Sequence, residues 1–278
     1  MKRVLSIQDI SCLGKCSLTV ALPIISAMGA ETAIVPTAVL STHTMFSNFT
    51  FRDLTEDMED IKNHWVKEGF QFDAIYTGYL GSKEQVQIVS DYFHTFKNEH
   101  NYIVVDPAMA DNGKMYAGFS PDFALEMAKL CGEADIILPN ISEACFMLNK
   151  EYVGEDADMD QIKALLLELG TLGAKTVVIT GVKLGDNRFG FMGYDVKSKD
   201  FFCYDTEEIP MKSHGTGDVF ASTFTGALMN DFSVYDSLKI AADYTCACIR
   251  NTYNDPDAVD YAVNFEVEIP YLLKMIGK

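Results

Sequence analysis

One stretch of the sequence decides the fold class: 161-QIKALLLELGTLGAKTVVIT-180. Its first part, Gln161–Leu172, has the amphipathic spacing of a helix, and its last part, Lys175–Thr180, is an almost uninterrupted run of apolar and β-branched residues. A strand of this composition is typically buried on both faces, because helices cover both sides of a parallel sheet. The stretch therefore predicts one helix–strand unit of an α/β fold.

The same alternation of short apolar runs and longer amphipathic stretches extends toward the N-terminus. We expect the short runs to be strands, at Val4–Gln8, Thr32–Pro36, Phe72–Tyr76, Tyr102–Asp106 and Ala134–Leu138. We expect the longer stretches to be helices, at Leu18–Met28, Lys83–Asn98, and after Ser120-Pro121 and Asn140. This order predicts a three-layer α/β/α sandwich with a mostly parallel central sheet, formed by a single domain over residues 1–278.

The alternation ends beyond Thr180. Arg188–Tyr194 and Asp200–Asp205 have the pattern of a β-hairpin, and Val219–Met229 and Asp236–Arg250 have the pattern of two consecutive helices. Segments of this character often form the edge of a sheet or a flap over a nucleotide.

The composition restricts the possible partners. Forty acidic against 22 basic side chains give a net charge of −18, which argues against nucleic acid because binding its phosphates needs a basic surface. The apolar run before Asp9 is too short for a signal peptide, and no run approaches the roughly 20 apolar residues of a membrane span. We therefore expect a cytoplasmic protein without a membrane partner. Its seven cysteines form no C-x-x-C pair and are expected to be reduced thiols.

Polar residues follow most of the predicted strands. They are Gln8-Asp9, Thr37 with Ser41–Thr44, Thr77–Tyr79, Asp106, Pro139-Asn140 and Thr180-Gly181. In open α/β sheets, ligands bind beyond the carboxyl ends of the strands. We therefore expect these residues to converge on one rim and to form a binding site there.

A glycine motif, Gly215-Thr216-Gly217-Asp218, opens the predicted helix Val219–Met229. Its backbone N–H groups and the helix dipole can hold a transferred phosphoryl group. Asp218, in the first turn, can accept the proton of an attacking hydroxyl. The alternative is an ordinary loop whose acidic residue complements the helix dipole. The motif is neither a Walker A loop nor a dinucleotide fingerprint.

Hard oxygen ligands occur at three predicted strand ends: Asp106, Asp111, Asn140 and Glu143. Magnesium prefers a few carboxylates together with water and phosphate oxygens. Asn140 and Glu143 lie three residues apart at a helix start and can face one point. Two alternatives stay open at this stage: Asn140 as a helix N-cap, and turn chemistry for Asp106 and Asp111.

These motifs together resemble the ribokinase superfamily and, within it, the pyridoxal/pyridoxamine (vitamin B6) kinases. The glycine motif carries the likeness to the superfamily. The likeness to the B6 kinases rests on further motifs in family order, namely Leu5–Gln8, Ser41–Thr44, Thr77–Ser82, Asp106–Met109, Pro139–Glu143 and Val177–Thr180. The resemblance covers nearly the whole chain and implies a kinase that phosphorylates the 5′-hydroxymethyl group of a B6 vitamer with ATP.

The resemblance also implies a role for each matching residue. Asp218 would deprotonate the substrate hydroxyl, and the N–H groups of Gly215, Thr216 and Gly217 would hold the transferred phosphate. The Mg²⁺·ATP phosphates would be served by Asp106, Asp111, Asn140, Glu143 and Thr180, with Asp106 and Glu143 as the metal ligands. The pyridine pocket would be lined by Asp9, His43, Thr44 and Tyr79. A monovalent cation such as K⁺ and a homodimer are also implied.

Two departures from the B6 kinases concern the substrate. Asp9 stands where many of these kinases have a serine that hydrogen-bonds the ring, and Ala38 and Leu40 are smaller or less aromatic than in some relatives. A carboxylate at position 9 favours a protonated ring nitrogen or a different hydroxyl pattern. The alternatives are a ribokinase-like kinase for hydroxymethylpyrimidine or a sugar, and a non-catalytic protein that binds B6 or nucleotide. The sequence assigns no role to His214 or Lys183.

Overall fold

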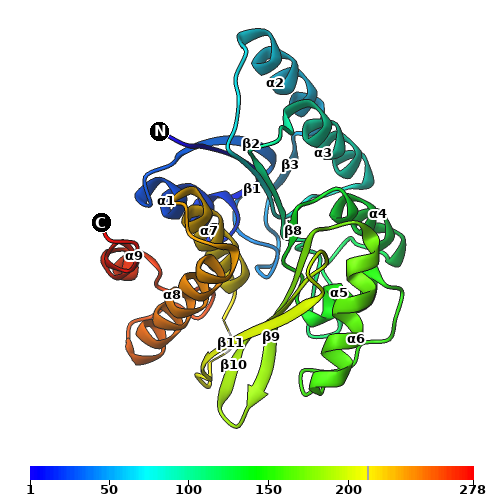
Figure 1. The fold of residues 1–278 in the computed structure, drawn as a ribbon. Coiled ribbons are helices and arrows are strands. Elements are labelled where there is room, and N and C mark those ends of the chain that lie inside the picture. Colours follow the sequence, from blue (N-terminus) through cyan, green and yellow to red (C-terminus); the bar gives the residue numbers. More distant parts are fainter. Residues whose placement is uncertain (212) are drawn as a thin grey trace. The chain divides into compact units, whose positions relative to one another are not determined.

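The structure is a computed structural model, and it describes residues 1–211 and 213–278. The chain forms two compact units, one made of Met1–Tyr76 with Thr206–Lys278 and the other of Thr77–Asp205. Figure 1 shows the elements of both units along the chain. The expectation of a single domain over 1–278 stays a prediction.

The first unit is built on four strands in the order β4-β1-β2-β3. Their bounds are β1 (Arg3–Ser11), β2 (Glu31–Leu40), β3 (Phe51–Asp53) and β4 (Ala74–Thr77), of which the last residue belongs to the second unit. β1 and β2 are parallel, and β3 is antiparallel to β2. The register of β1 against β2 shifts between Gln8 and Ile10, so Asp9 lies at an irregularity of the ladder.

The helices of the first unit are α1 (Leu18–Ala27), α2 (Thr55–Glu68), α7 (Thr216–Met229), α8 (Val234–Asn254), the short η2 (Glu266–Glu268) and α9 (Ile269–Met275). α1, α7, α8 and α9 share a core cluster that includes Val20, Met28, Val219 and Tyr244. A Cβ on Gly226 would lie 2.3 Å from the Met28 sulfur, so glycine allows α7 to approach α1 closely. Every residue of α7 from Val219 to Met229 is buried, including the hydroxyl side chains of Ser222, Thr223 and Thr225.

The second unit contains strands in the order β11-β10-β9-β8-β5. Their bounds are β5 (Tyr102–Val105), β8 (Ile136–Ile137), β9 (Thr176–Gly185), β10 (Arg188–Asp195) and β11 (Asp200–Glu207), of which the last two residues belong to the first unit. β5, β8 and β9 are parallel, and β10 is antiparallel to β9. The other elements are α3 (Lys83–Phe96), α4 (Pro121–Gly132), α5 (Ile141–Met147), α6 (Met159–Leu169), η1 (Gly170–Leu172) and the two-residue strands β6 (Ala110–Asp111) and β7 (Lys114–Met115).

The predicted fold class is confirmed, since the strands are mostly parallel and alternate with helices that flank them. The limits of several predicted strands were wrong. β1 and β2 extend to Ser11 and Leu40, so Asp9 and Thr37 lie inside strands and not after them. The strand predicted at Ala134–Leu138 is reduced to Ile136–Ile137, because Asp135 accepts the Ile103 N–H with its side chain and Pro139 ends the run.

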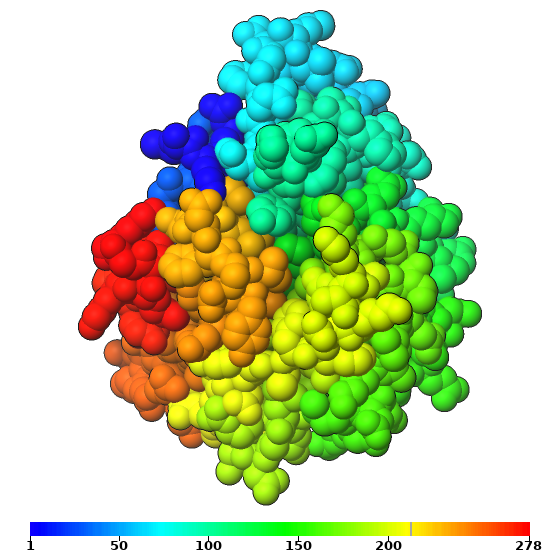
Figure 2. All heavy atoms as spheres, in the orientation of Figure 1, coloured from blue at the N-terminus to red at the C-terminus, as the bar shows by residue number. Residues whose placement is uncertain are grey.

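Among the residues that the structure describes, no helix combines the length and the apolar character that crossing a bilayer requires. On the face shown in Figure 2, the C-terminal residues (red) lie against the surface of α8 (orange).

Candidate active site

The glycine motif has the conformation that the sequence predicted. Gly215 is the N-cap of α7 with φ 77°, and a Cβ at this position would lie 2.4 Å from the Lys15 carbonyl oxygen. Only glycine fits both the left-handed backbone and this close approach. Asp218 follows in the first turn of α7, where the N–H groups of Gly215, Thr216 and Gly217 are also found.

The pKa of the Asp218 carboxyl group is raised above its ordinary value. The residue as a whole keeps part of its surface exposed, but its carboxylate is enclosed enough that burial raises its pKa to about 7. The Ser17 N–H donates a hydrogen bond to this carboxylate, which lowers the pKa, and the negative charge of Asp9 raises it again. A pKa near neutrality suits a general base, since the group can both accept and release a proton.

Asp9 is a second acidic group beside Asp218. It is 3% exposed and accepts hydrogen bonds from the Ser11 hydroxyl, at 2.8 Å, and from the Ser17 hydroxyl. Burial raises its pKa despite these bonds. The Cys16 thiol lies close to both carboxyl groups, and its pKa is raised by burial, then by Asp218 and Asp9. The two carboxylates therefore share a poorly solvated environment that opposes a double negative charge.

His43 lies over the loop that follows β1. A Cβ on Gly14 would lie 2.3 Å from His43 Cδ2, so the glycine leaves room for the imidazole ring. His43 is buried, its Nε2 lies 3.3 Å from the Tyr261 carbonyl oxygen, and burial lowers its pKa, which favours the neutral ring. The rings of Phe46 and His214 are 4.9 and 6.1 Å from the His43 ring. The half-buried Thr44 follows His43 directly.

In the second unit, Asn140 and Glu143 form a capping box at the start of α5. Asn140 is the N-cap, its Oδ1 accepts the Glu143 N–H at 2.9 Å, and Glu143 Oε2 accepts the Asn140 N–H at 2.9 Å. The N-cap alternative considered for Asn140 is therefore present in the structure. The Asn140 side chain also donates to the Ala110 carbonyl at 2.7 Å, and Glu143 Oε1 accepts the Met109 N–H at 3.1 Å. The capping box thus fixes the segment after β5.

Three carboxylates lie close together in this unit. Mainly through burial, the pKa of Glu143 is raised to about 7; backbone hydrogen bonds from Asn140, Met109 and Ala110 oppose this rise, and the charge of Asp111 contributes to it. The Cys131 thiol, whose pKa is raised mainly by burial, is affected by the charges of both Glu143 and Asp106. Asp106 is 8% exposed, whereas Asp111 is exposed and accepts two hydrogen bonds from Asn112, so the turn-chemistry alternative holds for Asp111.

Thr180 and Tyr79 complete the predicted set. Thr180 forms a parallel bridge with Asn140, and its hydroxyl lies 3.5 Å from the Pro139 carbonyl oxygen, so it adjoins the capping box. Tyr79 follows β4, and its ring lies 5.4 Å from that of Phe119. Within the second unit the structure therefore brings Asn140, Glu143 and Thr180 together.

The oxygen donors of the second unit fit a magnesium ion. No group of three potential metal-ligating side chains of the His, Cys, Asp and Glu type occurs among residues 1–211 and 213–278. Both oxygens of Glu143 already accept backbone N–H groups. Mg²⁺ commonly retains several waters and takes only one or two protein carboxylates, so Asp106 and Glu143 are of the chemical type that it binds.

The predicted site residues fall into two groups, one in each unit. The first unit contains Asp9, His43, Thr44 and Gly215–Asp218, and the second contains Tyr79, Asp106, Asp111, Asn140, Glu143 and Thr180. The convergence of all of them on one rim stays a prediction.

Sequence reasoning missed Ser17 and Ser11. Ser17 precedes α1 and reads as an N-cap, but its side chain makes no cap bond and instead lowers the pKa of Asp9. Its hydrogen bonds depend on the backbone of residues 14–17, where Gly14, Lys15 and Ser17 all have positive φ. The glycine in Leu13-Gly14-Lys15 was the only signal of this conformation in the sequence.

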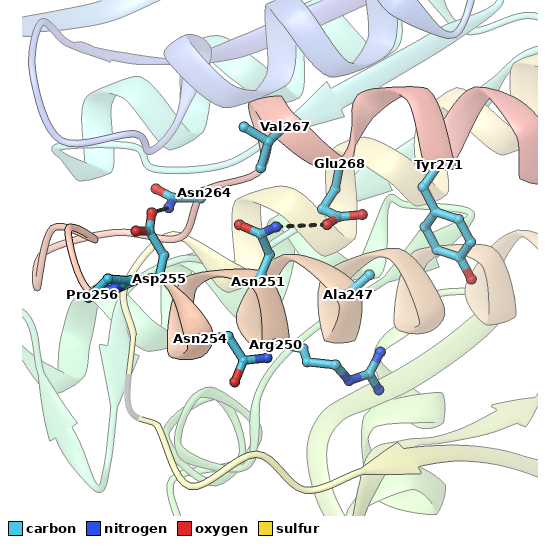
Figure 3. A pocket seen from close by; sticks show the side chains of 10 residues that line it. All are labelled: Ala247, Arg250, Asn251, Asn254, Asp255, Pro256, Asn264, Val267, Glu268 and Tyr271. Carbon is cyan, nitrogen blue, oxygen red and sulfur yellow. Dashed lines mark hydrogen bonds between the residues drawn. The ribbon is translucent and has the colours of Figure 1, made fainter.

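Apart from these groups, the first unit has an open hollow of about 840 Å³ beside α8 (Figure 3). Several of its polar lining residues are paired: Asn251 with Glu268 at 3.1 Å, Asn264 with Asp255 at 2.9 Å, and Arg250 with Glu207, which is outside the lining, at 2.7 Å. None of the predicted site residues is among the described residues that line it.

The chain matches the model of the family described as phosphomethylpyrimidine kinase over residues 21–260. A protein of Bacteroides thetaiotaomicron, assigned as a phosphomethylpyrimidine kinase and solved in a crystal form with pyridoxal, is 36% identical with a TM-score of 0.92, over 98% of this chain and 95% of that chain. Pyridoxal kinase from Lactobacillus plantarum is 28% identical with a TM-score of 0.90, over 99% and 98% of the two chains.

A curated relative has a different substrate in its name. The hydroxymethylpyrimidine/phosphomethylpyrimidine kinase of Aquifex aeolicus is 26% identical over 189 residues, which are 67% of this chain and 71% of the relative. The comparisons thus include kinases named for pyridoxal and kinases named for hydroxymethylpyrimidine and phosphomethylpyrimidine.

Proposed function

Because the chain belongs to the ribokinase-like family described as phosphomethylpyrimidine kinase, we propose that it transfers the γ-phosphoryl group of ATP to the 5′-hydroxymethyl group of pyridoxal, pyridoxine or pyridoxamine. The family confirms the expected resemblance and the expected enzyme class, a phosphotransferase with an alcohol group as acceptor. The observation that carries the proposal is Asp218, an enclosed carboxylate with a pKa near 7 at the glycine-lined start of a buried helix.

In the proposed reaction, Asp218 accepts the proton of the substrate hydroxyl while the oxygen attacks the γ-phosphorus. The bond to the β-phosphate oxygen breaks, and ADP leaves with that electron pair. The N–H groups of Gly215, Thr216 and Gly217 at the start of α7 stabilise the negative charge on the phosphoryl oxygens. This arrangement needs no covalent intermediate on the protein.

The ATP phosphates are assigned to residues of the second unit, namely Asp106, Asp111, Asn140, Glu143 and Thr180. Bound Mg²⁺ would neutralise phosphate charge, with Asp106 and Glu143 as its protein ligands. The Asn140 N–H of the capping box and the Met109 N–H support this role because they fix the Glu143 carboxylate by one hydrogen bond each, which leaves further lone pairs for water or metal.

The pyridine ring is assigned to Asp9, His43, Thr44 and Tyr79. His43 supports an aromatic ring-binding role, because it is a neutral imidazole surrounded by the rings of Phe46, Tyr261 and His214. The Asp9 carboxylate can accept a hydrogen bond from the substrate, for example from a protonated ring nitrogen. A homodimer, a bound K⁺ and a cytoplasmic location remain predictions from the sequence.

Hydroxymethylpyrimidine is the second candidate substrate, favoured by the family model and by the Aquifex aeolicus relative. A coupled assay of ADP release, run with the three vitamers, hydroxymethylpyrimidine and a sugar panel, separates the candidates. We expect the highest kcat/KM with a vitamer. A higher kcat/KM with hydroxymethylpyrimidine would replace the proposal by the second candidate.

Substitution of the base tests the mechanism. We expect Asp218→Asn to lower kcat by about 10³-fold or more, since the amide cannot accept the proton, while vitamer and nucleotide binding measured by calorimetry changes little. Turnover near the starting level in Asp218→Asn would contradict the assigned base.

A further inference from the structure

Residues 12–17 form the loop between β1 and α1, and this loop is fixed at both of its ends. The Cys12 N–H donates to the Leu40 carbonyl of β2 at 2.8 Å, and the Ser17 carbonyl accepts two backbone N–H groups of α1 at 3.0 and 2.9 Å. Between these ends the backbone is strained, since Lys15 and Ser17 have φ angles of 50° and 52°. Strained backbone persists only where surrounding contacts hold it, so the middle of the loop needs an anchor of its own.

The side chain of Lys15 provides this anchor. Its ammonium group donates to Glu266 Oε2 at 2.9 Å and to Asn264 Oδ1 at 3.3 Å. The two acceptors are 251 and 249 residues away along the chain, in the segment between α8 and α9. The lysine thus ties the loop after β1 to the C-terminal part of the first unit.

The segment that carries the two acceptors is itself held in place. The Asn264 N–H donates to the Thr252 hydroxyl at 2.7 Å, and Asn264 Nδ2 donates to Asp255 Oδ2 at 2.9 Å (Figure 3), which turns Oδ1 toward the lysine. The Phe265 carbonyl accepts the Tyr244 hydroxyl at 2.7 Å, and both of these rings are buried. Acceptors that are fixed in advance reduce the entropy lost when a long side chain binds them.

The backbone of Lys15 lies against the glycine motif. Its carbonyl oxygen is so close to Gly215 that a Cβ at position 215 would lie 2.4 Å from it. Gly215 is the N-cap of α7, and its carbonyl accepts the Val219 N–H at 3.0 Å in the first turn of that helix. A displacement of Lys15 would therefore be transmitted to the residue from which the N–H groups at the start of α7 take their direction.

We propose that Lys15 is a positioning residue: the bonds of its ammonium group to Glu266 and Asn264 hold its carbonyl against Gly215 and thereby fix the N–H groups that receive the transferred phosphoryl group. This inference rests on the proposed function, in which the glycine motif stabilises the charge of that group. It gives the segment at Asn264 and Glu266 a part in the reaction that requires no contact with the substrate.

Removal of the ammonium group tests this role. Lys15→Met keeps an unbranched apolar stem and loses both bonds. We expect kcat to fall about tenfold and KM for vitamer and ATP to change less than about threefold, because the N–H groups act mainly in the transition state. In Lys15→Arg the guanidinium has donors for both acceptors, so kcat should stay within about threefold. An unchanged kcat in Lys15→Met overturns the proposal, and so does an equal loss in the two variants.

Lys2→Met is the matched control. It also removes an ammonium group from an ion pair of the first unit, but the pair of Lys2 with Asp231 involves neither the loop nor residues 264–266. We expect its kcat to stay within about twofold of the starting protein. A loss as large as that in Lys15→Met would show that any missing surface charge slows the reaction, which overturns the specific role of Lys15.

A double-mutant cycle separates a role through Glu266 from a direct contact between Lys15 and bound phosphate. We expect Glu266→Ala alone to lower kcat about threefold, and Lys15→Met to lower it by only about threefold more in that background. Equal losses from Lys15→Met with and without Glu266 would show that the ammonium group acts on the ligand directly. That result overturns the proposal.

Hydrogen exchange gives a measurement that does not depend on turnover. The Val219 N–H is bonded to the Gly215 carbonyl, so its exchange, followed by NMR, reports whether Gly215 keeps its place. We expect this exchange to be about fivefold faster in Lys15→Met and to change less than about twofold in Lys15→Arg and Lys2→Met. Exchange of the Phe224 N–H, in the middle of α7, corrects for a change in global stability. A Val219 rate that changes no more than that of Phe224 overturns the proposal.

The kinetic and exchange measurements distinguish failure of this inference from failure of the proposed function. If no substrate of the panel is phosphorylated, the proposed function fails, while the exchange of Val219 still decides whether Lys15 holds Gly215. If the vitamers are phosphorylated and Lys15→Met changes neither kcat nor the exchange, only the positioning role is overturned.

Discussion

A carboxylate acts as a base only in its charged form, and burial of Asp218 raises the pKa at which it gains this charge to about 7. At pH 6 most molecules would then carry a protonated Asp218 and could not accept the substrate proton. The acidic limb of activity should thus lie close to neutrality, well above the ordinary pKa of 3.8 for an aspartate.

We expect kcat/KM to fall tenfold per pH unit below about pH 7 and to level off above it. This quantity reports ionisations of the free enzyme and free substrate, so the profile should be recorded with two vitamers that ionise differently. Circular dichroism at each pH verifies that the protein stays folded. A limb centred below pH 5 with both vitamers would contradict the raised pKa of Asp218.

At the residue scale, the sequence predicted the acidic group at the start of α7 and, as one alternative, Asn140 as the N-cap of α5. Gly215 and Asp218 could be predicted because a glycine motif followed by an apolar helix is a local pattern. The influence of Ser17 on the pKa of Asp218 could not, because it depends on the positive φ angles of Gly14, Lys15 and Ser17 and on the packing of α7 against that loop.

At the element scale, Asp135 ties together three elements of the second unit. Its carboxylate accepts the Ile103 N–H of β5 at 2.7 Å and binds the ammonium groups of Lys97, after α3, at 2.5 Å and Lys175, before β9, at 2.7 Å. Burial alone would raise its pKa, but the bonds from Lys175, Lys97 and Ile103 outweigh burial and lower it. The Asp135 N–H also donates to the Ile103 carbonyl and the Asp135 carbonyl accepts the Thr176 N–H, so the side chain adds to the backbone bonds at the start of β8.

We expect Asp135→Asn to lower the free energy of unfolding by about 2 kcal/mol at pH 7, because it leaves a partly buried Lys97 without its counter-charge. Since the pKa is lower in the folded state, the stabilisation exists above the unfolded pKa and disappears as pH falls through the folded pKa. The difference between variant and starting protein in urea unfolding should therefore shrink as the pH falls below the ordinary aspartate pKa of 3.8.

Lys175→Ala is the matched control for Asp135→Asn. Its side chain is 74% exposed, and exposed ion pairs contribute only about 0–1 kcal/mol. A loss in Lys175→Ala as large as that in Asp135→Asn would mean that the exposed ion pair, and not the bonds to β5 and Lys97, holds these elements together.

At the scale of the whole molecule, the fold class was predictable because the alternation of apolar runs and amphipathic stretches repeats along most of the chain. The strand order was not, since neighbours such as β1 and β2 are set by contacts between distant segments. The limits of β1 were misjudged for a related reason: Asp9 reads as the end of a strand, but its carboxyl group is buried on two serine hydroxyls, so the strand continues past it.

The net charge of −18 is also a property of the whole molecule. Like charges in excess destabilise a compact chain by mutual repulsion, and salt screens charges that are farther apart than about 10 Å at 0.1 M. Salt also weakens the exposed ion pairs, such as Lys183–Asp156, but these contribute little each. Repulsion should therefore dominate, and added salt should stabilise the protein.

We expect the midpoint of thermal unfolding to rise by a few degrees between 0.02 and 0.5 M NaCl, which corresponds to about 1 kcal/mol for a chain of this size. The same series in KCl separates screening from binding, because screening is equal for the two salts whereas a K⁺ site would stabilise the folded protein further as its occupancy grows. Equal curves that rise with salt would support screening alone and contradict the predicted K⁺ site. A midpoint that falls with NaCl would instead show that ion pairs outweigh the repulsion among the 40 acidic groups.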